Sequence, residues 1–257
     1  MEIIHYNKII QNELDININN YRTFSGKYLK YETITKEYKN DGKLIYEGEY
    51  LNGKRNGKGK EYYYYGYYGG IIFEGEYLKG KRNGKGKEYN FYGILIFEGE
   101  YLNGKKNGNG KEFNWNGKLE FEGEYLNGER NGKGKEYDWF GKLKFEGEYL
   151  KGKKWNGKGF DNKNTLVYEL KDGNGKVKEY YDNGKLRFEG EYLNGERKGK
   201  GKEYDCFGNL EFEGEYLKGK KWNGKGKEYD YFGKLKFEGE YLNGGRSGMK
   251  RKNNILL

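Results

Sequence analysis

Short segments of alternating side chains recur along the chain, and each opens on an aromatic ring. Residues 73–78 are FEGEYL, so the rings and the glycine point to one face of an extended strand and the two glutamates to the other. A turn rich in Asn and Gly follows, then a second strand of the type GKGKEY, then another turn that ends at glycine. Alternation with period two between such turns predicts a β-hairpin.

The hairpin unit recurs about ten times, with 20 to 27 residues between successive opening rings. We therefore predict an all-β protein, an elongated single-layer antiparallel β-meander of tandem ~24-residue hairpin repeats that forms a twisted, curled ribbon. About twenty strands spaced ~4.8 Å apart would give a ribbon roughly 95 Å long. The opening rings are Phe24, Tyr46, Phe73, Phe97, Phe121, Phe145, Tyr168, Phe188, Phe212 and Phe237.

The repeats divide the chain into three parts. Residues 24–248 hold the hairpin copies, with a degenerate copy at 168–187 and a decayed one at the C-terminal end. Residues 1–23 are predicted to form a cap segment, for which the sequence leaves a short helix and a strand as alternatives. Residues 249–257 form a basic and apolar tail. Atypical terminal copies are expected because they have only one neighbour.

Charge predicts the register of each hairpin. If two strand glycines face each other, both glutamates of the first strand oppose lysines of the second. Each exposed pair contributes only ~0.2–1 kcal/mol, but the pairs recur in every copy and disfavour a slipped sheet. The predicted cross-strand pairs are Gly75–Gly86, Glu74–Lys87, Glu76–Lys85 and Tyr77–Gly84.

Glycines inside strands cost stability, so their regular use indicates a neighbour that needs the empty space. We predict that this neighbour is an aromatic ring and that rings over glycines form the core. In the degenerate copy, Leu170 and Val177 replace two strand glycines and Asp172 replaces the tyrosine, as space filling would require. The structural repeat positions are Phe73, Gly75, Tyr77, Gly84 and Gly86, and Phe121, Gly123, Tyr125, Gly132 and Gly134.

Composition narrows the class of protein. Only 33% of the 257 residues are hydrophobic and the mean hydropathy is −1.23, which disfavours an ordinary globular core, yet 18% are aromatic and need burial. The net charge of +10 favours phosphate-bearing or acidic partners. The N-terminus lacks the pattern of a signal peptide and no apolar run could span a membrane, so we expect a cytoplasmic protein, with peripheral membrane attachment as the alternative.

Residues able to carry catalysis are scarce. His5 is the only histidine and has no partner motif, and Cys206 is the only cysteine, which we interpret as a structural thiol. The segment GKRNGKGK at 53–60 resembles a phosphate-binding loop only faintly, because its spacing is short and Gly59 stands where Ser or Thr is needed. We therefore predict that the chain is not an enzyme and uses no cofactor, metal or small-molecule substrate.

Basic turns are the strongest candidate binding feature. Paired cations recur at one turn of the repeat, and in the KKWNG copies an additional residue sets a tryptophan beside them. Lysines with an interfacial Trp suit an anionic membrane. The alternative is that each Trp packs on a neighbouring loop while the lysines keep the edge soluble. The candidate lipid- or partner-binding residues are Lys81, Arg82, Lys153, Lys154, Trp155, Lys220, Lys221 and Trp222.

The pattern aromatic-Glu-Gly-Glu-aromatic, then Asn-Gly, then Gly-x-Gly, resembles the MORN repeat, with YEGEYLNGKRNGKGKEY at 46–62 as a close example. The phrase GKLxFEGEYLNG also resembles the related YwqK-type repeat. Tyr stands where Trp is commoner at the fifth position, and Lys250 replaces a glycine in the last copy. The resemblance covers about residues 24–248 and implies an elongated antiparallel sheet that serves in scaffolding and self-association, or in phosphoinositide binding.

Two functions of different classes follow. The first is a non-enzymatic scaffold or adaptor that binds a protein partner or a second copy of the chain as a homodimer. The alternative is a peripheral membrane module that binds anionic phospholipids through the basic turns and their tryptophans. Nucleic acid is an unlikely partner, since the rings that would stack on bases are needed for the core.

Overall fold

The computed structural model describes residues 34–65, 68–229 and 234–247, which form β-strands joined by turns. Consecutive strands pair antiparallel except β12 and β13, which confirms the predicted all-β meander. In these ranges no helix is long and apolar enough to cross a membrane. The strands are β1 Thr35–Tyr38, β2 Leu44–Leu51, β3 Lys54–Tyr65, β4 Tyr68–Leu78, β5 Lys81–Tyr89, β6 Leu95–Leu102, β7 Lys105–Phe113, β8 Leu119–Leu126, β9 Glu129–Tyr137, β10 Leu143–Leu150, β11 Lys153–Phe160, β12 Leu166–Leu170, β13 Gly175–Tyr180, β14 Leu186–Leu193, β15 Glu196–Tyr204, β16 Leu210–Leu217, β17 Lys220–Tyr229, β18 Leu235–Leu242 and β19 Gly245–Ser247.

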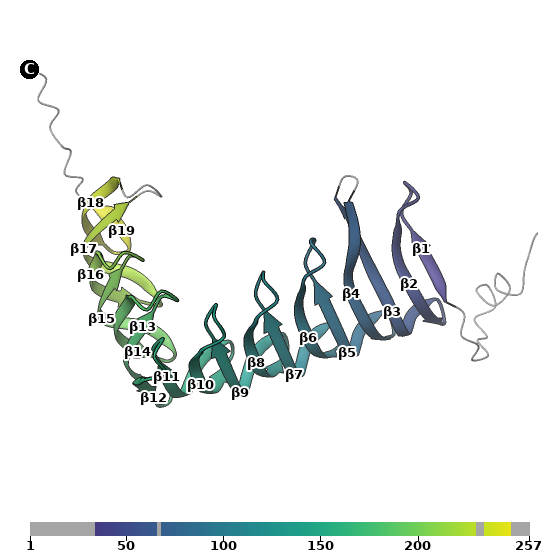
Figure 1. Cartoon of the computed structure of the whole chain (residues 1–257), viewed down its shortest axis with the longest axis horizontal. Helices are drawn as coiled ribbons and strands as arrows, with labels where there is room; N and C mark the ends of the chain where they lie inside the picture. The colour runs from purple at the N-terminus through teal and green to yellow at the C-terminus, as the bar shows by residue number, and fades with distance from the viewer. Residues whose placement is uncertain (1–33, 66–67, 230–233, 248–257) are drawn as a thin grey trace, which may run out of the picture. The chain divides into compact units, whose positions relative to one another are not determined.

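The chain divides into two compact units. The first comprises Met1–Gly110 and Trp115–Gly117, and the second comprises Lys111–Asn114 and Lys118–Leu257. In the first unit, neighbouring strands follow chain order from β1 to β7 (Figure 1). In the second, β8–β12 follow chain order and β13–β19 form a separate sheet. The predicted ribbon is therefore interrupted in the second unit, because the ladder stops between β12 and β13.

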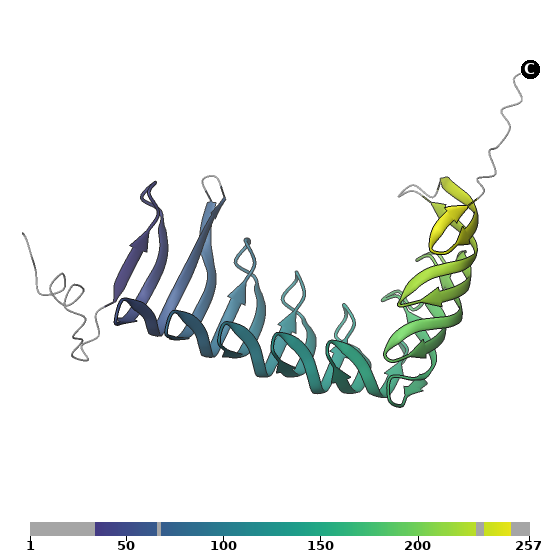
Figure 2. The ribbon, with the colours of Figure 1, turned by 180° about the vertical axis from the view of Figure 1, so that it is seen from behind.

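Two kinds of turn alternate along the repeats. Short turns have two residues in the left-handed region, such as Asn103 (φ 53°) and Gly104 (φ 87°), a conformation that favours Asn-Gly. Several long turns begin at an Asn or Asp, and two others begin at Lys39 and Tyr181. In one of the first kind, Oδ1 of Asp138 accepts hydrogen bonds from the backbone N–H groups of Phe140 and Lys142 at 2.9 and 2.8 Å. Figure 2 shows the long turns of the first unit at one edge and the short turns at the other.

The register of the β4–β5 hairpin is partly as predicted. Gly75 faces Gly86 and Glu74 faces Lys87, which confirms both pairs. The pairs Tyr77–Gly84 and Glu76–Lys85 are wrong, because the register shifts after Gly75 and Tyr77 faces Arg82. The expected pairs form across the other edge of β5 instead, where Gly84 faces Tyr101 and Lys85 faces Glu100 of the next hairpin.

The register shift is a β-bulge that explains two of the repeat glycines. Gly84 has φ of 90° and Gly132 has φ of 100°, a region that L side chains rarely adopt. The carboxylate of Glu76 lies against Gly84, and that of Glu124 against Gly132. In the first hairpin, the corresponding Glu49 accepts a hydrogen bond of 2.9 Å from the backbone N–H of Lys58. These glycines thus serve backbone conformation rather than ring space.

The other repeat glycines lie under rings. A Cβ at Gly134 would lie 2.5 Å from Cζ of Phe121, and one at Gly123 would lie 2.8 Å from the same atom. Phe73 is in the same position over Gly75 and Gly86. Phe73 and Phe121 are fully buried, and Tyr77 and Tyr125 are 4% exposed. Each Phe packs edge-to-face on the Tyr of its own strand, so the core is a row of rings above bare backbone.

The degenerate copy is where the ladder breaks. Leu170 and Val177 are buried, at 4% and 1% exposure, as expected if they fill space left by rings. The ring of Tyr168 lies instead over Gly159 of β11 and stacks on Phe145 with an interplanar angle of 21°. Between β12 and β13 only an isolated bridge joins Lys171 and Asn174. Packing of the aliphatic side chains of Leu170 and Val177 thus replaces the ring packing of one repeat, at the point where the sheet ends.

Several sequence predictions fall outside the described residues. These are the cap at 1–23, the tail at 249–257, His5 and the first opening ring, Phe24. Cys206 is an exposed free thiol in the long turn between β15 and β16.

Candidate functional site

The ring face carries a ladder of cations and carboxylates. In the second unit, Arg130 faces Tyr125, so its guanidinium lies over the ring of Phe121, 4.0 Å from the centroid. Arg130 also pairs with Glu112 and lies 3.8 Å from Glu136. Arg197 repeats the arrangement over the ring of Phe188. Because these cations cover the buried rings, they close the core on the side that the single sheet leaves open.

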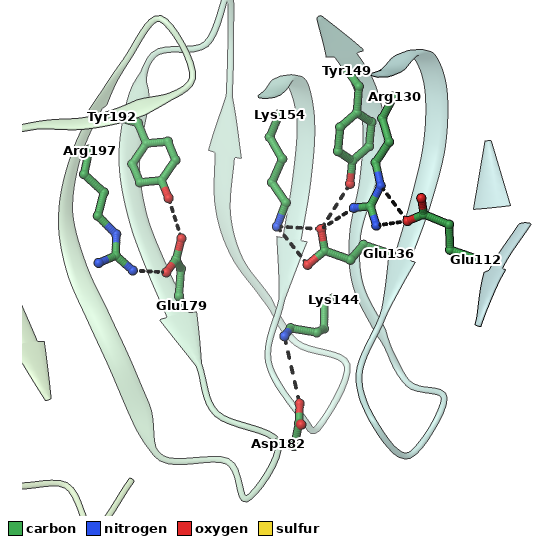
Figure 3. Close-up of polar contacts among 10 residues, drawn as sticks. All are labelled: Glu112, Arg130, Glu136, Lys144, Tyr149, Lys154, Glu179, Asp182, Tyr192 and Arg197. Atoms are coloured by element: carbon green, nitrogen blue, oxygen red, sulfur yellow. Dashed lines mark hydrogen bonds and ion pairs between the residues drawn. The ribbon is translucent and has the colours of Figure 1, made fainter. Parts of the chain in front are cut away.

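Lys154 is a half-buried cation of the ladder (Figure 3). Its Nζ lies 3.2 Å from Oε2 of Glu136 and 4.9 Å from the ring centroid of Phe145. The hydroxyl of Tyr149 donates to the same carboxylate at 3.2 Å. Burial disfavours the charged form of Lys154, but Glu136, together with Tyr168, Tyr149 and Glu179, outweighs burial and raises the pKa of Lys154. Burial also opposes ionisation of Glu136, yet Lys154 foremost among its neighbouring cations lowers its pKa.

A second network lies on the other side of the break. Glu179 of β13 accepts hydrogen bonds from Arg197 at 2.6 Å and from the hydroxyl of Tyr192 at 2.5 Å (Figure 3). Burial would raise the pKa of Glu179, but Arg197 and Tyr192, with Lys154, lower it. Ion pairs join the two sheets within this unit: Lys144 reaches Asp182 at 3.9 Å, and Lys153 reaches Glu196 at 2.7 Å. Charge therefore stabilises the junction where the backbone ladder is absent.

The paired cations of the short turns point in different directions. The first of each pair, as at Lys81, Lys153 and Lys220, is exposed at the turn. The second lies on the ring face, as Arg82 does between Glu61 and Glu88, each 2.6 Å away. Lys154 and Lys221 occupy the equivalent position, with ion pairs to Glu136 and Glu203.

The two loop tryptophans lie against the next short turn. A Cβ at Gly173 would lie 2.9 Å from Cε3 of Trp155, and one at Gly244 would lie 3.5 Å from Cε3 of Trp222. Trp155 is the extra residue of the β-bulge in β11. Beyond this bulge the regular pairing resumes, and Gly157 faces Gly147. Both tryptophans are half-buried. Each therefore packs on a neighbouring loop, which was the alternative to membrane insertion.

Exposed aromatic residues at the long turns are a surface feature that the sequence analysis missed. Phe91, Tyr92 and Trp115 are 60%, 69% and 62% exposed. They form one cluster in the first unit, with ring centroids of Phe91 and Tyr92 4.0 Å apart and those of Phe91 and Trp115 6.3 Å apart. The sequence does contain a signal for this cluster, since aromatic residues follow the Asn of a turn, where small polar residues are usual.

The fold and its surfaces define a tandem β-hairpin repeat protein with a core of rings over glycines. Five segments match the family model of the MORN repeat: residues 46–64, 73–90, 97–117, 121–138 and 188–206. The chain is therefore a MORN-repeat protein, as the sequence resemblance predicted; its relation to the YwqK-type variant stays a prediction. A search of curated proteins found no match.

Proposed function

We propose that this MORN-repeat chain is a non-catalytic scaffold whose long turns bind a protein partner or a second copy of the chain. The observation that carries the proposal is the exposed cluster of Phe91, Tyr92 and Trp115. Contiguous exposed aromatic side chains are unusual on a protein surface, and Trp and Tyr dominate the binding energy of protein interfaces.

Polar turns of the same chain show that folding does not need these rings. At the long turn after β11, Asn162 and Lys163 occupy the corresponding positions. Oδ1 of Asp161 still accepts the two backbone hydrogen bonds of the turn, from Lys163 at 2.9 Å and Thr165 at 2.8 Å. The rings of the cluster therefore add exposed apolar area without a role in turn geometry, which supports a role in binding.

The test replaces the cluster with the residues of the polar turn. We expect Phe91→Asn, Tyr92→Lys and Trp115→Asn together to leave the melting temperature within about 2 °C of wild type, because exposed turn positions contribute little to stability. The same variant should lose self-association in sedimentation velocity or lose a retained partner in quantitative affinity capture. The control replaces Asn162 and Lys163 with serine. Equal association and equal retention by wild type and cluster variant would refute the proposal.

An anionic membrane surface is the second candidate, favoured by the exposed lysines of the short turns. Lys79 and Lys81 are both exposed in one such turn, and each cation near an anionic surface contributes ~1 kcal/mol. We expect Lys81→Glu, Lys153→Glu and Lys220→Glu together to abolish sedimentation with phosphoinositide vesicles at low salt. Lys154 and Lys221 are left unchanged because they stabilise the fold. Binding that survives these reversals, or an absence of binding by wild type, would exclude this candidate.

A further inference from the structure

A groove of about 660 Å³ lies beside the interruption between β12 and β13. Backbone at Gly190, Gly201 and Gly214 contributes to its lining, and Val167 adds an apolar side chain from β12. Strand residues on the face opposite the rings also line it. These are Lys176 and Lys178 of β13, Glu189 and Glu191 of β14, Lys200 and Lys202 of β15, and Glu213 and Glu215 of β16.

The positive charges of the β13 lysines face fewer glutamates than those of lysines on strands inside the sheet. On β15, Lys202 faces Glu189 on one side and Glu213 on the other. On β13, Lys176 faces Glu191 on one side only, because the sheet begins at this strand. Where strands with lysines alternate with strands with glutamates, the opposite charges cancel each other's potential at short range. The positive potential is therefore strongest at β13, where this alternation stops.

Three of the four carboxylates of the groove have neighbours that hold them. Glu189 accepts a hydrogen bond from the hydroxyl of Tyr204 at 2.9 Å. Glu213 pairs with Lys202 at 3.2 Å, and Glu215 accepts from the side chain of Asn223 at 3.3 Å.

The lysines differ from these carboxylates. Lys176, Lys178 and Lys200 are exposed, and none forms an ion pair within the part of the chain that the structure describes. The groove therefore presents three available cations.

We propose that this groove binds an extended acidic segment of the scaffold's protein partner; the inference rests on the proposed function and specifies one surface for it. Lys176 and Lys178 are two residues apart on one strand, about 7 Å, the spacing of alternate side chains in an extended peptide. Lys200 lies two strands further, roughly 10 Å away. Carboxylates at alternate positions of an extended chain match the spacing of Lys176 and Lys178, and Lys200 adds positive charge beside them.

The glutamates between the lysines select against denser anions. A polyphosphate or a nucleic acid backbone would bring continuous negative charge past Glu189 and Glu191, at a cost in repulsion. In an extended peptide whose carboxylates point to the lysines, the side chains between them point away from the groove. The expected motif is therefore an acidic residue at every second position with uncharged residues between.

The probe is the fluorescein-labelled peptide GEVEVEVEG, followed by fluorescence polarisation with the full chain. We expect saturable binding that weakens from low to high salt. Lys176→Gln, Lys178→Gln and Lys200→Gln together should weaken it about tenfold or more. The matched control is Lys58→Gln, Lys60→Gln and Lys85→Gln, which changes the corresponding residues of the first unit and should leave affinity within about twofold.

The proposal would be overturned by equal binding of GQVQVQVQG, by an equal loss in the control variant, or by no binding of the acidic probe at millimolar protein. Displacement by inorganic phosphate or phosphoinositide vesicles, beyond that by chloride at equal ionic strength, would assign the lysines to phosphate ligands and overturn it as well. The aromatic cluster variant should bind the peptide like wild type, so a failure of the groove is distinguishable from a failure of the scaffold proposal.

Discussion

Lys154→Ala should lower the free energy of unfolding by about 3 kcal/mol, the lower end of the effect of removing one partner from a buried ion pair, because both side chains of this pair are half-buried. Glu136 would lose its contact at 3.2 Å, and Glu179 would lose one of the cations that lower its pKa. The ring of Phe145 would lose the ammonium group above it. Because this lysine lies where the backbone ladder stops, other contacts compensate poorly for its loss.

Urea denaturation monitored by circular dichroism measures this difference, with Lys153→Ala as the matched control. Lys153 is the preceding residue, and its ion pair with Glu196 is 44% and 37% exposed, so the control should change stability by less than about 1 kcal/mol. Lys154→Arg keeps the charge and should recover much of the loss. Equal midpoints for the two alanine variants would contradict a structural role for Lys154.

Acid should narrow the difference in the free energy of unfolding between wild type and Lys154→Ala. The pKa of Glu136 is below its ordinary value in the folded chain, so its stabilising effect is present above the unfolded pKa and disappears as pH falls through the folded pKa. In Lys154→Ala the pKa of Glu136 is lowered less, because its main cationic neighbour is absent. Acidification therefore removes less stability from the variant than from wild type.

Hairpin repeats and facing glycines were predictable because alternation and charge act locally. The opposition of Gly75 to Gly86 followed from pairing Glu74 with Lys87. The bulge was not predictable in the same way, since a glycine required by positive φ, such as Gly84, has the same letter as one required by a ring.

The ladder on the ring face was missed for a geometric reason. The turn between β4 and β5 has only two residues, Lys79 and Gly80, so Arg82 is already the second residue of β5 and projects over Phe73, 4.0 Å from the ring centroid. Counting it as a turn residue hid its role. Treating all rings as core likewise hid the cluster at Phe91, Tyr92 and Trp115, whose rings are exposed rather than packed in the core.

Gly134→Ala should destabilise the chain by about 1–3 kcal/mol, the usual cost of overpacking a core. Its added Cβ would lie 2.5 Å from Cζ and 2.7 Å from Cε2 of Phe121, a fully buried ring that also packs on Tyr125 and Tyr149. The control is Gly70→Ala in β4, where a Cβ would meet nothing within 4 Å and the glycine has no positive φ. This change should be neutral or stabilising, because alanine restricts the unfolded chain.

A double-mutant cycle separates loss of space from loss of backbone freedom. Phe121→Leu alone removes ring packing, but in its presence the methyl group of Gly134→Ala gains room, so the second change should cost less than it does in wild type by about 1 kcal/mol or more. Additive effects would mean that the glycine serves the backbone rather than the ring. The chain contains a partial precedent: at the position equivalent to Gly134 it has Val177, buried to 1% exposure, where Tyr168 lies over Gly159 instead. Side-chain bulk is thus accommodated where the ring has moved away, which is the condition that the cycle reproduces.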